Sequence, residues 1–112
     1  MRQVLATASR LIHAPPKIVY GILADYRRGH PSILPRRGFL SLDVEEGGIG
    51  AGTVFRLRMK VIGVTRAMRA RVTEPIPGQV LVETDESAGI RTTFDVRPDG
   101  TGQDARVTIR TQ

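Results

Sequence analysis

Apolar and polar residues alternate in short runs through most of the chain, a pattern typical of strands with one buried and one solvated face. In the clearest run, 53–62, Phe55, Leu57 and Met59 point one way while Arg56 and Arg58 point the other. The same period predicts strands over 4–12, 39–46, 64–74, 80–84, 90–97 and 105–111. Because short turns join most of these runs, we expect an antiparallel sheet of about seven strands.

One segment near the N-terminus has helical periodicity instead. Two prolines, which suit the first turn of a helix, precede apolar residues at 18, 19, 22 and 23. This spacing predicts a helix over 16–26, in which we expect Gly21 to allow close packing against the sheet. The segment 27–38 contains glycine and prolines and is expected to be a loop with one helical turn.

A glycine-rich stretch, 47–52, separates two of the predicted strands. It contains four glycines in six residues, which suits a tight turn because glycine reaches positive φ without steric cost. A phosphate-binding loop would need a following helix with its N–H groups aimed at the anion. A strand follows instead, so the stretch is interpreted as a structural turn.

Length and composition indicate one domain with its own core. The chain has 112 residues and no cysteine, which excludes disulfides and thiolate chemistry and fits a reducing compartment. Its longest apolar run, 18–24, is far shorter than the roughly 20 residues that a membrane span needs. We therefore expect a cytoplasmic protein without a membrane span.

The net charge of +6 is concentrated in the first third of the chain. Residues 1–42 hold seven basic side chains against one acidic, whereas residues 43–112 hold ten of each. Four of the basic residues flank His30 within eleven positions of the predicted loop: Arg27, Arg28, Arg36 and Arg37. Such a patch can attract an anionic ligand, a membrane surface or nucleic acid, or it can be a solvated loop. With one aromatic residue beside it, a base-stacking surface for nucleic acid is disfavoured.

Candidates for catalysis and metal binding are few. The two histidines and the carboxylates show no metal-ligand spacing, so no metal or other cofactor is expected. His30 is expected to bond backbone at the end of the helix, and no catalytic residue is assigned. Glu83 and Asp95 are expected on the wet face of the sheet, paired with arginines.

Several local motifs occur together in a characteristic order. They are Ile12-His13-Ala14-Pro15-Pro16-Lys17-Ile18-Val19-Tyr20, Leu23-Ala24-Asp25-Tyr26, His30-Pro31 with Leu34-Pro35, Glu45-Glu46-Gly47-Gly48-Ile49-Gly50-Ala51-Gly52-Thr53, Arg71-Val72-Thr73-Glu74-Pro75 and Arg106-Val107-Thr108-Ile109. In this order and spacing the chain, 1–112, resembles the START-like, or SRPBCC, superfamily, which includes polyketide cyclase/dehydrase-like and coenzyme-Q-binding proteins.

The resemblance implies an α+β helix-grip fold: a curved seven-stranded antiparallel sheet, one or two short helices and a long C-terminal helix. The sequence stops at Gln112, where that long helix would begin, so the helix is missing. Either the chain is a fragment or a short form closes its groove in another way. The resemblance also implies an apolar ligand held against the concave face of the sheet.

The predicted helix is too short to cover that face, and an exposed apolar surface of this size usually marks a binding surface. Our main hypothesis is that the groove binds a small hydrophobic ligand that is lipid, isoprenoid or polyketide-like. The residues expected to line it are Tyr20, Phe55, Leu57, Met59, Met68, Thr92 and Phe94. Two alternatives stay open: an enzyme of cyclase or dehydratase type, and an interaction module whose open sheet pairs with a second copy, as a homodimer, or with a partner helix.

Overall fold

Seven strands and two short helices make up the described part of the chain, residues 6–112 of this computed structural model. In chain order they are β1 (Ala6–Ile12), α1 (Pro16–Ala24), α2 (Gly29–Ile33), β2 (Phe39–Glu46), β3 (Val54–Val61), β4 (Val64–Ile76), β5 (Val80–Asp85), β6 (Ile90–Asp99) and β7 (Asp104–Thr111). The seven predicted strands and the helix are confirmed. Residues 4 and 5 of the first predicted strand lie outside the described residues.

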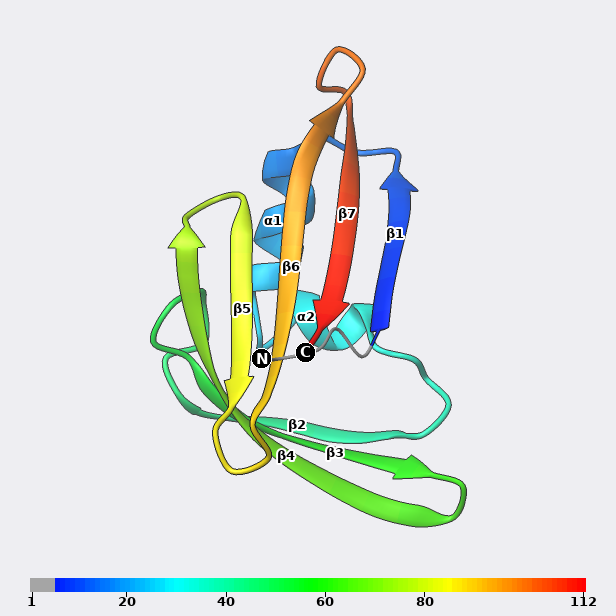
Figure 1. Cartoon of the computed structure of the whole chain (residues 1–112), viewed down its shortest axis with the longest axis vertical. Coiled ribbons are helices and arrows are strands. Elements are labelled where there is room, and N and C mark those ends of the chain that lie inside the picture. The colour runs from blue at the N-terminus through cyan, green and yellow to red at the C-terminus, as the bar shows by residue number, and fades with distance from the viewer. Residues whose placement is uncertain (1–5) are drawn as a thin grey trace.

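All strands form one antiparallel sheet in the order β1-β7-β6-β5-β4-β3-β2. The sheet curves because β4 is long enough to join two parts of it. Its residues 64–71 pair with β3, and its residues 71–76 pair with β5. In the view of Figure 1, strands β2 to β4 therefore run across the molecule below β5, β6, β7 and β1. Both helices lie on one face of this sheet, which we call the concave face.

The core lies between α1 and the concave face. Helix α1 packs against β6 and β7 and buries Val19, Tyr20, Leu23 and Ala24. These side chains belong to one cluster with buried residues of the sheet: Phe55, Ala70, Val72, Leu81, Phe94, Val96, Ala105 and Val107. The helix thus buries one side, but the predicted apolar face is only partly confirmed, since Ile18 and Ile22 are 56% and 42% exposed.

The glycine-rich stretch is a turn, as predicted, and it also fixes the end of α1. The turn uses left-handed backbone, with φ of 69° at Gly47 and 63° at Gly50. The Tyr26 N–H donates to the Gly48 carbonyl at 2.8 Å, and the Gly50 N–H donates to the Ala24 carbonyl at 2.9 Å. These bonds explain why the helix ends at Ala24 and not at residue 26 as predicted.

The expected close approach at Gly21 is wrong. Gly21 is exposed, and a Cβ added there would meet no atom within 4 Å. The close approach occurs at Gly29, where an added Cβ would lie 2.9 Å from the carbonyl carbon of Ile22. Glycine at position 29 therefore lets α2 begin directly against the backbone of α1.

Candidate ligand-binding site

The concave face has a half that the helices cover and a half that they leave open. Strand register places Phe55 and Phe94 on this face, opposite Ala70 and Leu81 respectively. Phe55 is 1% exposed and Phe94 is 6% exposed. The prediction that these two rings line an open groove is therefore not supported by their burial. They form the floor of the covered half.

The open half is formed by the hairpin of β3 and β4. Leu57 faces Met68 across the two strands, and Met59 is the next residue along on the same face. All three side chains are half-buried, and Leu57 and Met68 pack against the edge of the core. The partner of Met59 in the register is Arg66, an exposed residue that places a positive charge toward the hairpin tip. The open half is thus apolar with a basic end.

A polar cluster of Tyr26, His30 and Glu83 lies inside the covered half. The Tyr26 hydroxyl donates to Glu83 Oε2 at 2.6 Å, and His30 Nε2 lies 3.3 Å from the same oxygen. The Nδ1–H of His30 donates a hydrogen bond to the Leu23 carbonyl at 2.8 Å. The Tyr26 ring stacks between His30 and Phe55, with centroid distances of 4.4 and 4.9 Å. These three polar residues are less than 7% exposed.

Burial is the largest cause of the pKa shifts of all three groups in this cluster. Removal from water raises the pKa of Glu83 to about 7, and the hydrogen bond from Tyr26 opposes that rise. Burial lowers the pKa of His30, and burial together with the neighbouring carboxylate raises the pKa of Tyr26. Because Nδ1 of His30 donates to a carbonyl, its Nε2 is free to accept a proton from Glu83. A protonated Glu83 can therefore donate a hydrogen bond to His30 across the 3.3 Å that separate them.

The expectation that Glu83 lies on the wet face is wrong. Glu83 sits on the same side of β5 as Leu81, and it pairs with Val72 on one side and Thr92 on the other. The alternation of the sequence already places Glu83 on the same side of the strand as Leu81. It does not show whether that side is the buried one. The prediction for His30 is confirmed, since the ring bonds the last turn of α1. Its contact with Glu83 was not predicted.

A second carboxylate fixes Tyr20 at the other side of α1. The Tyr20 hydroxyl donates to Glu74 Oε2 at 2.6 Å, and the Ala51 N–H donates to Glu74 Oε1 at 2.7 Å. Burial, followed by the bond to Glu74, raises the pKa of Tyr20. Tyr20 thus links α1, β4 and the glycine turn, and its hydroxyl is engaged in that link.

The structure separates the predicted site residues into two groups. Tyr20, Phe55 and Phe94 are buried and form the helix-covered core. Leu57, Met59, Met68 and Thr92 are half-buried on the concave face. Thr92 lies directly opposite Glu83 in the strand pairing, so it is a polar group beside the buried cluster.

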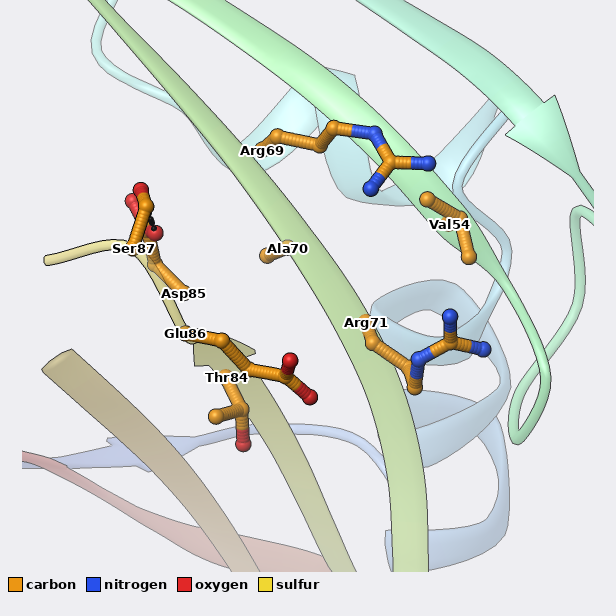
Figure 2. Close-up of a pocket in the computed structure, with 8 residues that line it drawn as sticks. All are labelled: Val54, Arg69, Ala70, Arg71, Thr84, Asp85, Glu86 and Ser87. Carbon is orange, nitrogen blue, oxygen red and sulfur yellow. Dashed lines mark hydrogen bonds between the residues drawn. The ribbon is translucent and has the colours of Figure 1, made fainter. Parts of the chain in front are cut away.

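Two hollows on the sheet have charged residues of both signs in their walls. The first, of about 410 Å³, is lined by Val54, Arg69, Ala70, Arg71, Thr84, Asp85, Glu86 and Ser87. Figure 2 shows the arginines on β4 at one side and the acidic residues at the end of β5 at the other. The second, of about 320 Å³, is lined by Thr93, Asp95, Arg97, Pro98, Asp99, Arg106, Thr108 and Arg110. Walls with charges of both signs do not suit a hydrophobic ligand.

Within residues 6–112, no three metal-binding side chains come close enough to hold an ion. The same residues contain no helix with the length and apolar character required to cross a bilayer. The predicted basic patch lies on both sides of α2. Arg27 donates to the Gly47 carbonyl at 3.1 Å, while Arg28, Arg36 and Arg37 are exposed.

This chain is similar in structure to KanY protein, to an aromatase/cyclase and to a START superfamily protein. KanY protein has 32% identity and a TM-score of 0.85, over 99% of this chain and 74% of that chain. The aromatase/cyclase Zhui from Streptomyces sp. R1128 has 17% identity and a TM-score of 0.73, over 95% and 64% of the two chains. A START superfamily protein from Mycobacterium smegmatis has 14% identity and a TM-score of 0.70, over 97% and 75%. The sequence matches no protein-family model and no curated protein.

Proposed function

Because this chain belongs to the START-like, or SRPBCC, superfamily, we propose that it binds a small hydrophobic molecule on the concave face of its sheet. The candidate ligands are a lipid, an isoprenoid or a polyketide-like compound. The observation that carries the proposal is the open half of that face. Leu57, Met59 and Met68 are apolar and half-buried there, while α1 packs on β6 and β7.

The chemistry of these residues fits an adaptable hydrophobic site. Methionine side chains are flexible and polarizable, so Met59 and Met68 can follow ligands of irregular shape. Thr92 and the buried cluster behind it supply a few polar groups next to an apolar wall, as small-molecule sites commonly do. Arg66 adds a positive charge on the same face of the hairpin. A ligand with an apolar body and one polar end suits this arrangement.

The test is binding of a neutral hydrophobic dye, N-phenyl-1-naphthylamine, followed by fluorescence. Met68→Asp places a carboxylate on the open half, and Ala67→Asp places one on the opposite face of the same strand, where residue 67 is exposed. We expect Met68→Asp to weaken binding by about tenfold or more, since a carboxylate against an apolar ligand is costly to desolvate. Ala67→Asp should bind the dye as the unmodified chain does.

Equal binding by both variants, with circular dichroism showing that both are folded, would refute the proposed site. If Met68→Asp does not fold, Met68→Ser provides a milder change with the same expected direction. Sedimentation velocity of the unmodified chain tests the interaction alternative. A homodimer that excludes the dye would mean that a second copy covers the open half. A native mass spectrum then shows whether a small molecule copurifies.

A reaction of cyclase or dehydratase type is the second candidate, and the pair of His30 and Glu83 is the observation that favours it. A carboxyl group with a pKa near 7 beside a neutral imidazole can both give and accept a proton at neutral pH. Both side chains are buried, and Thr92 lies opposite Glu83 in the strand pairing. Loss of one water mass from a copurified compound, by the unmodified chain but not by Glu83→Gln, would support this candidate.

A further inference from the structure

The outward side of the two helices exposes large aliphatic side chains. Ile18 and Ile22 lie one turn apart on α1 and are 56% and 42% exposed, opposite the side that packs on the sheet. Ile33, at the end of α2, is 46% exposed. Residues four apart on a helix share a face, so Ile33 lies on the side of α2 that carries Gly29. We call Ile18, Ile22 and Ile33 the isoleucine patch.

The two helices that carry the patch pack against each other. Gly29 packs against the backbone of Ile22, which brings the Gly29 side of α2 against α1. Ile33, one turn from Gly29, therefore belongs to the side of α2 that is nearest α1. Three branched aliphatic residues on short helices make a ridge and not a pocket. Exposed apolar residues gathered in this way mark an interaction surface more often than scattered ones do.

The segment that carries the isoleucine patch has an excess of positive charge. Between residues 6 and 42 there are six basic side chains and one acidic side chain, Asp25. The Asp25 carboxylate accepts the backbone N–H groups of Arg27 and Arg28, each at 3.2 Å. Among the described residues, the arginines in ion pairs all belong to the sheet: Arg56, Arg69, Arg97 and Arg106. Lys17, Arg28, Arg36 and Arg37 are exposed and lie within four residues of a patch residue or of α2 in the sequence.

We propose that the isoleucine patch and these flanking basic residues dock the protein on the surface of an anionic lipid bilayer. Aliphatic side chains gain by entering the boundary between headgroups and acyl chains, and basic residues beside them are attracted to anionic lipids. Nucleic acid would favour aromatic residues that stack on bases, and the patch has none. The docking surface is separate from the open half of the concave face, so it does not depend on the proposed ligand.

Co-sedimentation with vesicles tests the docking surface. The chain should bind vesicles of phosphatidylcholine mixed with phosphatidylserine, and it should bind pure phosphatidylcholine weakly. Added salt should weaken the first interaction, because screening shortens the range of the attraction. The double variant Ile18→Ser/Ile22→Ser should bind the anionic vesicles with a partition coefficient about tenfold lower. Its matched control is Ile62→Ser/Val64→Ser, two exposed apolar residues at the tip of the β3–β4 hairpin.

The charge is tested by a second pair of variants. Arg36→Gln/Arg37→Gln should weaken binding to the anionic vesicles and reduce its salt dependence. Arg58→Gln/Arg91→Gln removes two exposed charges from the sheet and should have little effect. The two variants of the docking surface and Arg58→Gln/Arg91→Gln should keep the dye binding of the unmodified chain, so failure of docking can be distinguished from failure of the ligand site.

Three outcomes would overturn the proposal. The first is no binding to anionic vesicles at low salt. The second is an equal loss of binding in the helix variants and in their sheet controls. The third is a different occupant of the patch: a homodimer that Ile18→Ser/Ile22→Ser dissociates, or RNA binding that the same variant leaves intact.

Discussion

Replacing Glu83 with glutamine should make the stability of the protein less sensitive to rising pH. Glutamine keeps the size of the side chain, can accept the hydrogen bond from Tyr26 and can donate to His30 Nε2. It removes only the proton that Glu83 can release. The substitution therefore isolates the effect of a buried carboxyl group whose pKa is raised to about 7 from its ordinary 4.5.

The sign and size of the effect follow from proton linkage. Between pH 4.5 and 7 the folded protein holds the Glu83 proton and the unfolded chain has released it. The free energy of unfolding contributed by Glu83 therefore falls as pH rises through this window. A shift of 2.5 pK units at 1.36 kcal/mol each amounts to about 3 kcal/mol. His30, whose lowered pKa acts in the opposite direction below about pH 6.5, is present in both proteins, so the comparison between them largely removes its effect.

The measurement is urea unfolding, followed by circular dichroism, of both proteins at about pH 4.5 and pH 8, which bracket the raised pKa. Relative to the unmodified chain, Glu83→Gln should gain about 3 kcal/mol in going from the lower to the higher pH. Glu86→Gln, at an exposed position of the next loop, controls for the loss of one negative charge. If Glu83→Gln and Glu86→Gln respond to pH alike, Glu83 is ionised in the folded protein and the reasoning is refuted.

Two further predictions concern packing, and thermal and urea unfolding check both. Gly29→Ala should lower the free energy of unfolding by about 1–3 kcal/mol, because its Cβ would press on the backbone of Ile22. Gly21→Ala should raise the free energy of unfolding by up to about 1 kcal/mol, because an added Cβ meets nothing within 4 Å there. Similar effects at the two glycines would contradict the close approach of α2 to α1. Leu81→Ala should lower the free energy of unfolding by about 2–5 kcal/mol because Leu81 is 0% exposed. Ile76→Ala, at a 49% exposed position, should lower it by about 1 kcal/mol or less. Comparable losses of stability in Leu81→Ala and Ile76→Ala would contradict the position of Leu81 in the core.

The periodicity of the sequence was a sufficient guide to most of the sheet. Alternation has a period of two and turns are marked by glycine and proline, so strand number and approximate bounds follow from local information. The bounds of β4 were less accurate, since it continues through Pro75 to Ile76. That extension lets β4 pair with both β3 and β5, which is a relation between distant strands and leaves no local signal.

The candidate site was predicted only in part, for a similar reason. Leu57 and Met68 were placed on one face by alternation, and the register confirms that they lie opposite each other. Alternation could not show that α2 and Tyr26 would cover Phe55 and Phe94. Those contacts depend on how the chain continues after α1, where the bond from the Tyr26 N–H to Gly48 sets its direction.

The sequence by itself determined the sheet, the first helix, the glycine turn and the charge surplus of the first third, because each depends on neighbours along the chain. Tertiary structure alone decided which side of β5 is buried, and it thereby brought Glu83 against Tyr26 and His30 from more than 50 residues away. It also decided which isoleucines remain exposed. Burial depends on what packs against a residue, and that is a property of the whole fold and not of a segment.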